Sequence, residues 1–290
     1  MNKNTNMLQY LYHNGGYYLT NTPLFTAANR AFRYGDSIFE SMAMQHGKIP
    51  MLNAHCQRLA QSAKLLQITL PESFQPEAVA VVCRQLRVLN GNPEHARIRL
   101  CLYRADGGLY LPPSNTGNLL IELTPQKNPC FCIGLPGVNV VIYPRPLLSY
   151  TPFSHLKTGN SLPYIAARLY AGEQGAQDCL LLNHLGEVAE STNANIFWME
   201  NEQLFTPPLA SGCVGGVMRQ MLLQRLLPDM NVSCTEKPLQ TQALLQAREV
   251  LLTNATSGIR HVATAEGKIY GNTVSETIQQ RLLLLTQGNV

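Results

Sequence analysis

The stretch "DCLLLNHLGEVAESTNANIFWMENEQLFTP", residues 178–207, decides the fold class. Its short apolar runs are separated by polar turns at 184–186 and 200–201, a pattern typical of an antiparallel meander. Glu190 lies inside one of these apolar runs and is followed by small polar residues. A carboxylate is costly to bury unless a cation or hydrogen-bond donors meet it. Glu190 is therefore a strand-edge acid, a member of a buried hydrogen-bonded network, or a partner for a protonated heterocyclic nitrogen.

The sequence on either side of this stretch predicts both strands and helices. Alternating apolar residues predict strands, and apolar residues three or four apart predict helices. Asn53 is the predicted N-cap of the helix at 53–68. The predicted strands are a hairpin at 9–19, a second hairpin at 36–52 turning at His46–Gly47, and segments 96–105, 118–125, 137–144 and 248–270; the predicted helices are 53–68, 75–90, the segment from Thr158 to about Gly172, 215–227 and the C-terminal tail.

This mixture predicts an α+β protein of two domains, with mainly antiparallel sheets and flanking helices. The Pro- and Asn-containing stretch 124–129 predicts the boundary between them. We expect a smaller N-terminal domain at 1–125 and a larger C-terminal domain at 130–290.

Bulk composition excludes several classes of function. The chain of 290 residues is 45% hydrophobic and 14% charged, as expected for a soluble globular protein. Its net charge of +4 comes from scattered residues, so we expect no nucleic-acid partner. The apolar runs are too short for a membrane span, and the N-terminal ten residues lack the apolar core of a secretory signal. The eight cysteines include no CxxC pair, which predicts reduced thiols, no metal site and a cytoplasmic protein.

Lys157 is the first candidate for chemistry. It lies in "SHLKTGNSLPYIAARLYA", residues 154–171, a segment that contains no acid. A lysine in a loop is usually a solvated surface group. The alternative is a desolvated amine, whose lowered pKa leaves it neutral often enough to attack a carbonyl carbon.

Three further stretches are candidates for binding an anion. Gly215 and Gly216 precede a predicted helix, whose first N–H groups can face an anion. The small polar turn 253–257 can form a backbone nest for phosphate. Arg58, on the helix at 53–68, can clamp a phosphate. Each also has an ordinary interpretation, as a loop, a turn or a surface arginine.

Together and in this order, these stretches resemble the fold-type IV pyridoxal-phosphate (PLP) enzymes, the class-IV aminotransferase superfamily. That group contains branched-chain aminotransferases, D-amino-acid aminotransferases and 4-amino-4-deoxychorismate lyases. The resemblance covers most of the chain and is carried by "RAFRYGDSIFESM", "NAHCQRLAQSAKLL", "LKTGN", "CLLLNHLGEVAESTNANIFW", "GGVMRQMLL" and "LLTNATSGIRHV".

The resemblance implies a role for each candidate residue. Lys157 forms the Schiff base with pyridoxal 5'-phosphate, and Glu190 contacts the pyridine nitrogen. The cofactor then lies in the cleft between the two domains. The implied remaining cofactor ligands are Arg58, Asn195 and the amides of Val217, Met218, Asn254 and Ala255.

The substrate side of the site is predicted by the same resemblance. Arg97 and Arg99 share one face of their strand, and Arg104 lies on the other. Three arginines solvating a strand is the ordinary interpretation. The resemblance favours Arg104 as the reader of a substrate carboxylate, with Tyr34 and Phe39 lining the pocket.

Three departures leave the subgroup open. The tyrosine that follows the lysine by five residues in branched-chain enzymes is Leu162 here, and Asn160 is similar to the D-amino-acid aminotransferases and lyases. Ala255 replaces a common threonine. "FES" at 39–41 is typical of transaminases, although some lyases share it.

We therefore predict a PLP-dependent aminotransferase that moves an amino group between a small, branched-chain-like amino acid and a 2-oxo acid. The first alternative is a 4-amino-4-deoxychorismate lyase that releases pyruvate and 4-aminobenzoate. The second is an inactive binding protein with the same fold. The resemblance also implies a homodimer.

Overall fold

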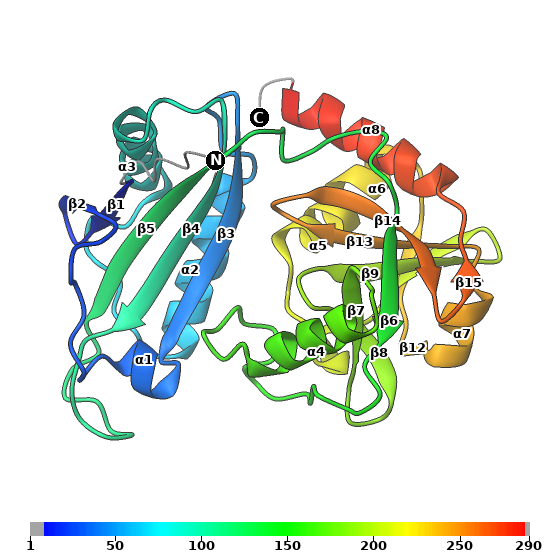
Figure 1. Ribbon diagram of the computed structural model, residues 1–290, viewed down its shortest axis with the longest axis horizontal. Coiled ribbons are helices and arrows are strands. Elements are labelled where there is room, and N and C mark those ends of the chain that lie inside the picture. Colours follow the sequence, from blue (N-terminus) through cyan, green and yellow to red (C-terminus); the bar gives the residue numbers. More distant parts are fainter. Residues whose placement is uncertain (1–8, 288–290) are drawn as a thin grey trace, which may run out of the picture. The chain divides into compact units, whose positions relative to one another are not determined.

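The computed structural model describes residues 9–287, and the chain divides into two compact units, Met1–Cys130 and Phe131–Val290 (Figure 1). The division follows directly after the stretch 124–129, where the sequence placed the boundary. Each unit has its own sheet and its own buried apolar cluster, so each is described by itself.

Unit 1 is a five-stranded sheet with helices on one face. The strands follow the order β2-β1-β5-β4-β3, and all their pairings are antiparallel. Its elements are β1 (Tyr10–His13), β2 (Gly16–Leu19), α1 (Arg30–Tyr34), β3 (Ser37–Gln45), α2 (Leu52–Leu65), α3 (Pro76–Leu89), β4 (His95–Arg104) and β5 (Gly117–Gln126).

The two faces of this sheet differ in chemistry because side chains alternate along each strand. Ile98 and Leu100 of β4 are buried in one apolar cluster with Leu59 of α2 and Leu86 of α3. Figure 1 shows α2 running along the sheet. Arg97, on the opposite face, is exposed. The helices therefore cover one face and leave the arginines on the other.

Unit 2 holds the larger sheet, with strand order β11-β10-β9-β13-β14-β6-β7-β8-β12 and β15 paired to β14. Its elements are β6 (Val138–Ile142), α4 (Leu162–Glu173), β7 (Asp178–Leu182), β8 (Glu187–Ser191), β9 (Asn195–Glu200), β10 (Gln203–Thr206), a 3₁₀ turn (Leu209–Ser211), α5 (Val217–Met221), a π-helical turn (Leu222–Leu226), α6 (Leu227–Asp229), β11 (Cys234–Glu236), β12 (Leu239–Gln240), α7 (Thr241–Gln246), β13 (Glu249–Asn254), β14 (Gly258–Ala265), β15 (Lys268–Ile269) and α8 (Thr273–Gln287).

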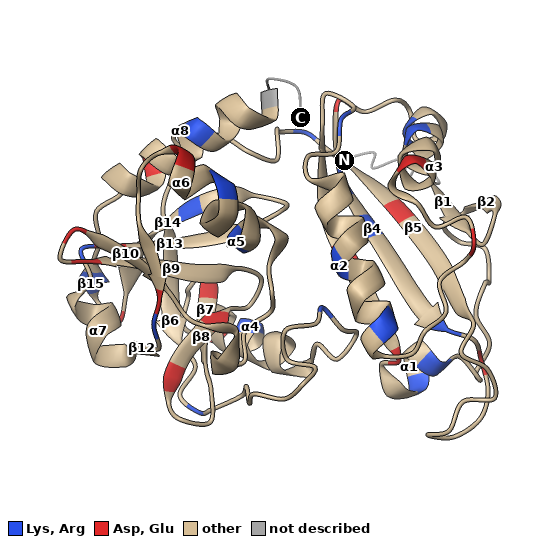
Figure 2. Cartoon of the chain, turned by 180° about the vertical axis from the view of Figure 1, so that it is seen from behind, with Lys and Arg blue, Asp and Glu red and all other residues tan. Residues whose placement is uncertain are grey.

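The predicted fold class is confirmed. Three pairs in unit 2 are parallel, β10–β11, β6–β14 and β6–β7, and the other pairs are antiparallel. The stretch 178–207 forms β7 to β10, but the predicted continuous meander was wrong: β7 pairs with β8 and β9 pairs with β10, while β13, β14, β6 and β7 lie between β9 and β8 in the sheet. Charged residues of both signs are interspersed over the helices and strands of each unit (Figure 2).

Within residues 9–287, no helix combines the length and apolar character that a bilayer crossing requires.

Two local predictions for unit 1 were wrong. Asn53 is not the N-cap of α2, because the helix already begins at Leu52 after Met51 in the left-handed region. The second arm of the hairpin at 36–52 does not form a strand. Lys48 makes a single bridge to Gln45 before the chain turns into the helix. The first hairpin, by contrast, forms as predicted around Asn14–Gly15, both with positive φ.

The two faces of β4 predict opposite responses to truncation. Ile98→Ala should lower the free energy of unfolding by about 2–5 kcal/mol, because it leaves a cavity between sheet and helices. Arg97→Ala, one residue away, should change it by less than about 0.5 kcal/mol. Urea unfolding followed by circular dichroism measures both values. Equal costs at the two positions would contradict the assignment of the faces.

Candidate active site

Lys157 lies in the irregular chain just before α4 and is half-buried. Pro163 occupies the first turn of this helix, a position that suits proline because no helical N–H is lost there. Ala167 and Ala171 of α4 are buried against β7 and β8 in one apolar cluster. The helix is thus packed on the sheet, and its N-terminal end brings the Lys157 segment into electrostatic range of Glu190.

Glu190 lies in β8 and is 3% exposed. One carboxylate oxygen accepts a hydrogen bond from Tyr164 Oη at 2.8 Å. The other accepts from the backbone N–H of Val214 at 3.1 Å and from Asn195 Nδ2 at 3.4 Å. Three neutral donors, from α4, the loop before α5 and β9, therefore hold the carboxylate in one orientation.

The electrostatics of Glu190 are those of an acid short of positive charge. Burial raises the pKa of the carboxyl to about 7, because the charged form loses its hydration. The hydrogen bonds from Tyr164 and Val214 and the charges of Lys157 and Arg219 lower this pKa but do not outweigh burial. The carboxyl is thus poised to ionise fully when a further cationic donor reaches it.

Tyr164 is the residue that the sequence reasoning missed. Leu162, at the position of the tyrosine in branched-chain enzymes, is 77% exposed. Tyr164, two residues later, reaches Glu190 instead, and burial raises the pKa of its phenol. Helical spacing could have revealed it, because Tyr164, Ala167 and Ala171 fall on one stripe of α4.

Asn195, the first residue of β9, links the loop before α5 to Glu190. Asn195 Nδ2 donates to the carbonyl of Val214 at 2.8 Å as well as to Glu190. A Cβ at Gly216 would collide with Asn195 Oδ1, so glycine is needed there for close packing. Gly216 was predicted to allow an anion to approach the backbone. The structure shows that the Asn195 side chain approaches the backbone here.

The predicted anion-binding amides of Val217 and Met218 begin α5. Gly216 is the N-cap, and no side chain caps this helix end. The first N–H groups of a helix lack partners within the helix and attract anions when no side chain meets them. The arrangement is therefore suited to a phosphate.

The β13–β14 turn supplies the second predicted anion site. Asn254 Oδ1 accepts from the backbone N–H groups of Thr256 and Ser257 at 2.9 and 2.8 Å. Asn254 Nδ2 donates to the carbonyl of Asn193 at 3.2 Å, so this turn is tied to the turn that follows Glu190. The structure thus brings the predicted residues Asn254 and Ala255 to the β8–β9 end of the site.

One buried hydroxyl nearby lacks a partner among the described residues. Thr253 Oγ1 is buried, and the residue is 1% exposed. Thr253 pairs with Asn195 across β13 and β9, and cross-strand partners project from the same face. An unsatisfied hydroxyl, an uncapped helix end and a buried acid form a donor and acceptor set that fits a phosphorylated ligand with a protonated ring nitrogen, such as pyridoxal 5'-phosphate.

Arg58 lies in unit 1, on α2, and forms a bidentate ion pair with Glu40 of β3. His55, one turn earlier on α2, contacts the same carboxylate through Nδ1 at 2.6 Å. Burial acts to raise the pKa of Glu40, but the contacts with His55 and Arg58 outweigh it and lower that pKa. A buried, ionised Glu40 therefore orients the Arg58 guanidinium. Glu40 was noted in the sequence as part of "FES", but this positioning contact was not predicted.

The open face of the unit 1 sheet brings together part of the predicted substrate set. The Arg99 guanidinium lies over the Phe39 ring, with 3.9 Å between Cζ and the ring centroid. Arg97 lies two residues along β4 on the same face. This face thus combines two arginines with an aromatic wall.

Arg104 and Tyr34 are placed elsewhere. Arg104 is buried and donates to Asp36 at 2.9 Å, to the carbonyls of Gln67 and Leu66 at 3.0 and 2.8 Å, and to Asn115. These contacts favour a structural role for Arg104 over the predicted role in reading a substrate. Tyr34, at the end of α1, packs on Tyr110, with 5.7 Å between ring centroids.

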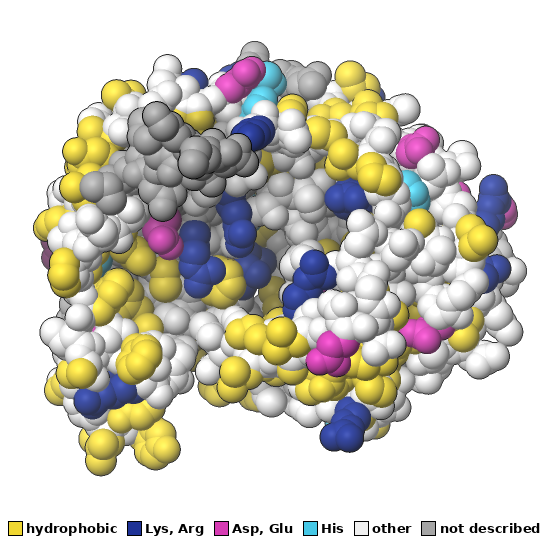
Figure 3. Space-filling model, in the orientation of Figure 1, with side chains coloured by type: hydrophobic (Ala, Val, Ile, Leu, Met, Phe, Trp, Pro, Cys, Tyr) yellow, Lys and Arg dark blue, Asp and Glu magenta, His cyan; other side chains and the backbone are white. Residues whose placement is uncertain are grey.

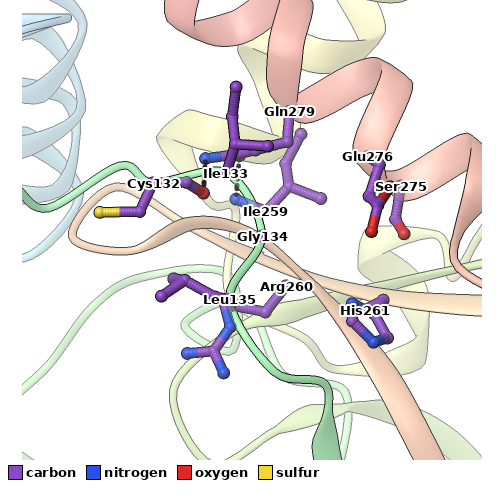
Figure 4. Close-up of a pocket in the computed structure, with 10 residues that line it drawn as sticks. All are labelled: Cys132, Ile133, Gly134, Leu135, Ile259, Arg260, His261, Ser275, Glu276 and Gln279. Atoms are coloured by element: carbon purple, nitrogen blue, oxygen red, sulfur yellow. Dashed lines mark hydrogen bonds between the residues drawn. The ribbon is translucent and has the colours of Figure 1, made fainter.

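A separate small cavity in unit 2 does not belong to this site. It lies between the 132–135 segment, β14 and the start of α8 (Figure 4), and has a volume of about 20 Å³. That volume accommodates roughly one water molecule. It is too small for a cofactor, and none of the predicted site residues lines it.

The sequence is similar to those of known proteins over most of its length. Over 283 residues the chain is 29% identical to a Methanocaldococcus jannaschii protein provisionally assigned as a branched-chain-amino-acid aminotransferase, covering 94% of this chain and 93% of that one. It is 26% identical to the aminodeoxychorismate lyase of Vibrio harveyi, covering 84% of this chain and 87% of that one.

Solved structures show the same fold. The branched-chain aminotransferase of Thermoproteus uzoniensis, solved with norvaline, matches at a TM-score of 0.86 and 21% identity, over 97% of this chain and 96% of that one. A second branched-chain amino acid aminotransferase, solved with N-(5'-phosphopyridoxyl)-L-glutamate, matches at 0.84 and 20% identity, over 98% and 96%. The family model for amino-transferase class IV matches residues 37–265, most of both units. The chain therefore belongs to the class IV aminotransferases, a family of PLP-dependent enzymes.

Proposed function

We propose that this protein is a PLP-dependent aminotransferase that moves an amino group between a small, branched-chain-like amino acid and a 2-oxo acid. The observation that carries the proposal is the buried Glu190 carboxyl in electrostatic range of Lys157. The Lys157 amine could react with an aldehyde, and the buried Glu190 carboxyl would be stabilised as a carboxylate by a cation. A cofactor with an aldehyde and a basic ring nitrogen would suit both groups. The names of the aminotransferase relatives support the choice of substrate.

The proposed cofactor ligands follow from the geometry of unit 2 and from the resemblance. Glu190 would pair with the ring nitrogen, and the helix start at Val217 and Met218 would meet the phosphate. Arg58, Asn195 and the Asn254–Ala255 turn complete the proposed set. When bound, the cofactor supplies an aldehyde that condenses with amines and a ring that withdraws electrons.

The chain's own residues then have distinct tasks. Lys157 Nζ would hold the aldehyde carbon between turnovers and, once released by an incoming amine, move a proton at the substrate Cα. Tyr164, by donating to Glu190, would keep that carboxylate aimed at the ring nitrogen. Glu190 would hold the proton at that nitrogen, because an ionised neighbour favours the protonated form.

For the substrate carboxylate, we propose Arg99 and Arg97 ahead of Arg104, whose donors are engaged within unit 1. The aromatic contact between Arg99 and Phe39 favours an apolar side chain next to a carboxylate. Two arginines on one face equally suit a dicarboxylate such as aminodeoxychorismate. The lyase therefore remains the second candidate, supported by its relative and by Asn160.

The proposed assembly is a homodimer in the cytoplasm, with no nucleic-acid or membrane partner. Its support is the resemblance, together with the loop between β4 and β5. There Leu109, Tyr110 and Leu111 are 75%, 89% and 86% exposed. Hydrophobic side chains also lie on the surface at this end of unit 1 in Figure 3. Contiguous exposed apolar residues are typical of a protein–protein contact.

The reaction is tested by product analysis. Purified protein, incubated with L-leucine and 2-oxoglutarate, should form glutamate, which mass spectrometry detects. D-alanine and aminodeoxychorismate are offered in parallel. Lys157→Ala should lower turnover by at least about 100-fold, whereas Lys268→Ala, at an exposed lysine of the same unit, should not. Release of pyruvate from aminodeoxychorismate without glutamate formation would select the lyase.

Arg58 is tested by cofactor affinity. Arg58→Ala should weaken binding of pyridoxal 5'-phosphate about 10- to 100-fold, since a charge-assisted contact is lost. Adding Glu40→Ala should not restore affinity, because it returns no cation to the proposed phosphate site. Arg84→Ala, on the exposed side of α3, is the matched control. Unchanged affinity in a folded Arg58→Ala protein would remove Arg58 from the phosphate site.

Glu190 makes stability depend on pH in the cofactor-free protein. Its pKa in the folded state, about 7, lies above the usual 4.5, so the folded state binds more protons between these values. Stability therefore falls as pH rises from about 4.5 to 7, by up to about 3 kcal/mol for this group. In Glu190→Gln that fall should be absent when urea unfolding is compared at pH 5 and pH 7.5.

The exposed acid Glu173 provides the control for this titration, because Glu173→Gln should keep the wild-type slope. Adding pyridoxal 5'-phosphate should flatten the wild-type dependence, since a cationic partner lowers the pKa of the acid. Identical pH slopes in wild type and Glu190→Gln would contradict the proposal.

A further inference from the structure

Three potential metal ligands meet at the end of the β3–β4 pair in unit 1, on residues not assigned to the active site. His46 follows β3 directly, Glu94 precedes β4, and His95 is the first residue of β4. Gln45 pairs with His95 in the last antiparallel register of these strands. The three residues are therefore held together by the sheet, although His46 and Glu94 lie far apart in the sequence.

Backbone geometry explains why their side chains converge. His46 has a φ of 49°, in the left-handed region, which breaks the normal alternation of a strand. Its ring packs edge-on against the His95 ring, with 4.9 Å between centroids. Its Nδ1 lies 2.6 Å from Glu94 Oε1. One nitrogen or oxygen from each residue lies within 4.8 Å of the other two.

The turn is also fixed in place by its surroundings. The Gly47 N–H donates to the Glu94 carbonyl at 3.4 Å, and Arg87 Nε donates to the Pro93 carbonyl at 2.8 Å. Gly47 has a φ of 74°, and a Cβ there would collide with Arg87. The segments that carry His46 and Glu94 are thus held by backbone contacts rather than by their side chains alone.

An ordinary ion pair does not account for the whole cluster. The His46–Glu94 pair is more than 60% exposed on both sides, and such pairs contribute little to stability. His95 is different: the residue is 6% exposed, and its Nδ1 is buried with no hydrogen-bond partner among the described residues. Leaving such a nitrogen unsatisfied destabilises the folded state. A ligand that accepts a nitrogen lone pair removes that cost.

We propose that His46, Glu94 and His95 bind a divalent transition-metal cation of the zinc class. Two imidazoles and one carboxylate are ligands that such cations prefer, with bonds of roughly 2.0–2.2 Å. Bound metal would separate Nδ1 of His46 from the Glu94 oxygen to roughly 3 Å, a small movement for two exposed side chains. Their exposure leaves a fourth position open to water. The cation would link the residue that follows β3 to the start of β4.

The test uses untagged, full-length holoenzyme and two probes, Zn²⁺ and Co²⁺. Calorimetric titration should show one Zn²⁺ per chain at a site that His46→Ala weakens at least about 10-fold. Co²⁺ should give the visible absorption of a four-coordinate nitrogen and oxygen site in the wild type. That absorption should be lost in both His46→Ala and Glu94→Gln.

His184→Ala, at an exposed turn histidine of unit 2, is the matched control and should bind as the wild type does. All eight cysteines remain in every variant, so metal bound by thiols stays constant across the series. Because His46 and Glu94 are exposed, their variants should fold, as circular dichroism verifies. Equal Zn²⁺ binding in all four proteins, or none in the wild type, would overturn the proposal.

Discussion

A carboxylate removed from water needs positive charge, and Glu190 receives most of its contacts from neutral groups. Tyr164, Asn195 and the Val214 backbone each donate to it, yet burial still raises the pKa of the acid to about 7. Those contacts specify its orientation without neutralising it. A cationic ring nitrogen, as in the proposed cofactor, would supply the missing positive charge, and this deficit links the fold of unit 2 to its proposed chemistry.

Several elements of unit 2 pack so that their side chains and backbone contact Glu190. Helix α4 is packed on the sheet by Ala167 and Ala171, which places Tyr164 against the acid and Lys157 near it. The loop before α5 needs glycine at 216, because Asn195 occupies the space of a side chain. Each contact comes from a different part of the chain, so the site exists only when α4, β8, β9 and the loop before α5 are packed together.

Sequence reasoning singled out residues that are unusual for their surroundings, such as Lys157 and Glu190, whose roles stay predictions. It also predicted helices and strands with a clear hydrophobic period. It failed where position depends on tertiary contacts. Tyr164 contacts Glu190 only because α4 packs on β7 and β8. Arg104 alternates as predicted along β4, but its burial follows from contacts with Asp36 and with the carbonyls of Leu66 and Gln67, which are distant in sequence. The turn at His46–Gly47, by contrast, was predicted from its glycine, and both residues have positive φ.

Infrared difference spectroscopy of Glu190 tests the central claim most directly. Subtracting the spectrum of Glu190→Gln from that of the cofactor-free wild type at pH 6 should reveal the carbonyl stretch of a protonated carboxylic acid. Pyridoxal 5'-phosphate should abolish that band and produce the carboxylate bands at the same pH. A carboxyl group already ionised without the cofactor, or still protonated with it, would contradict the account.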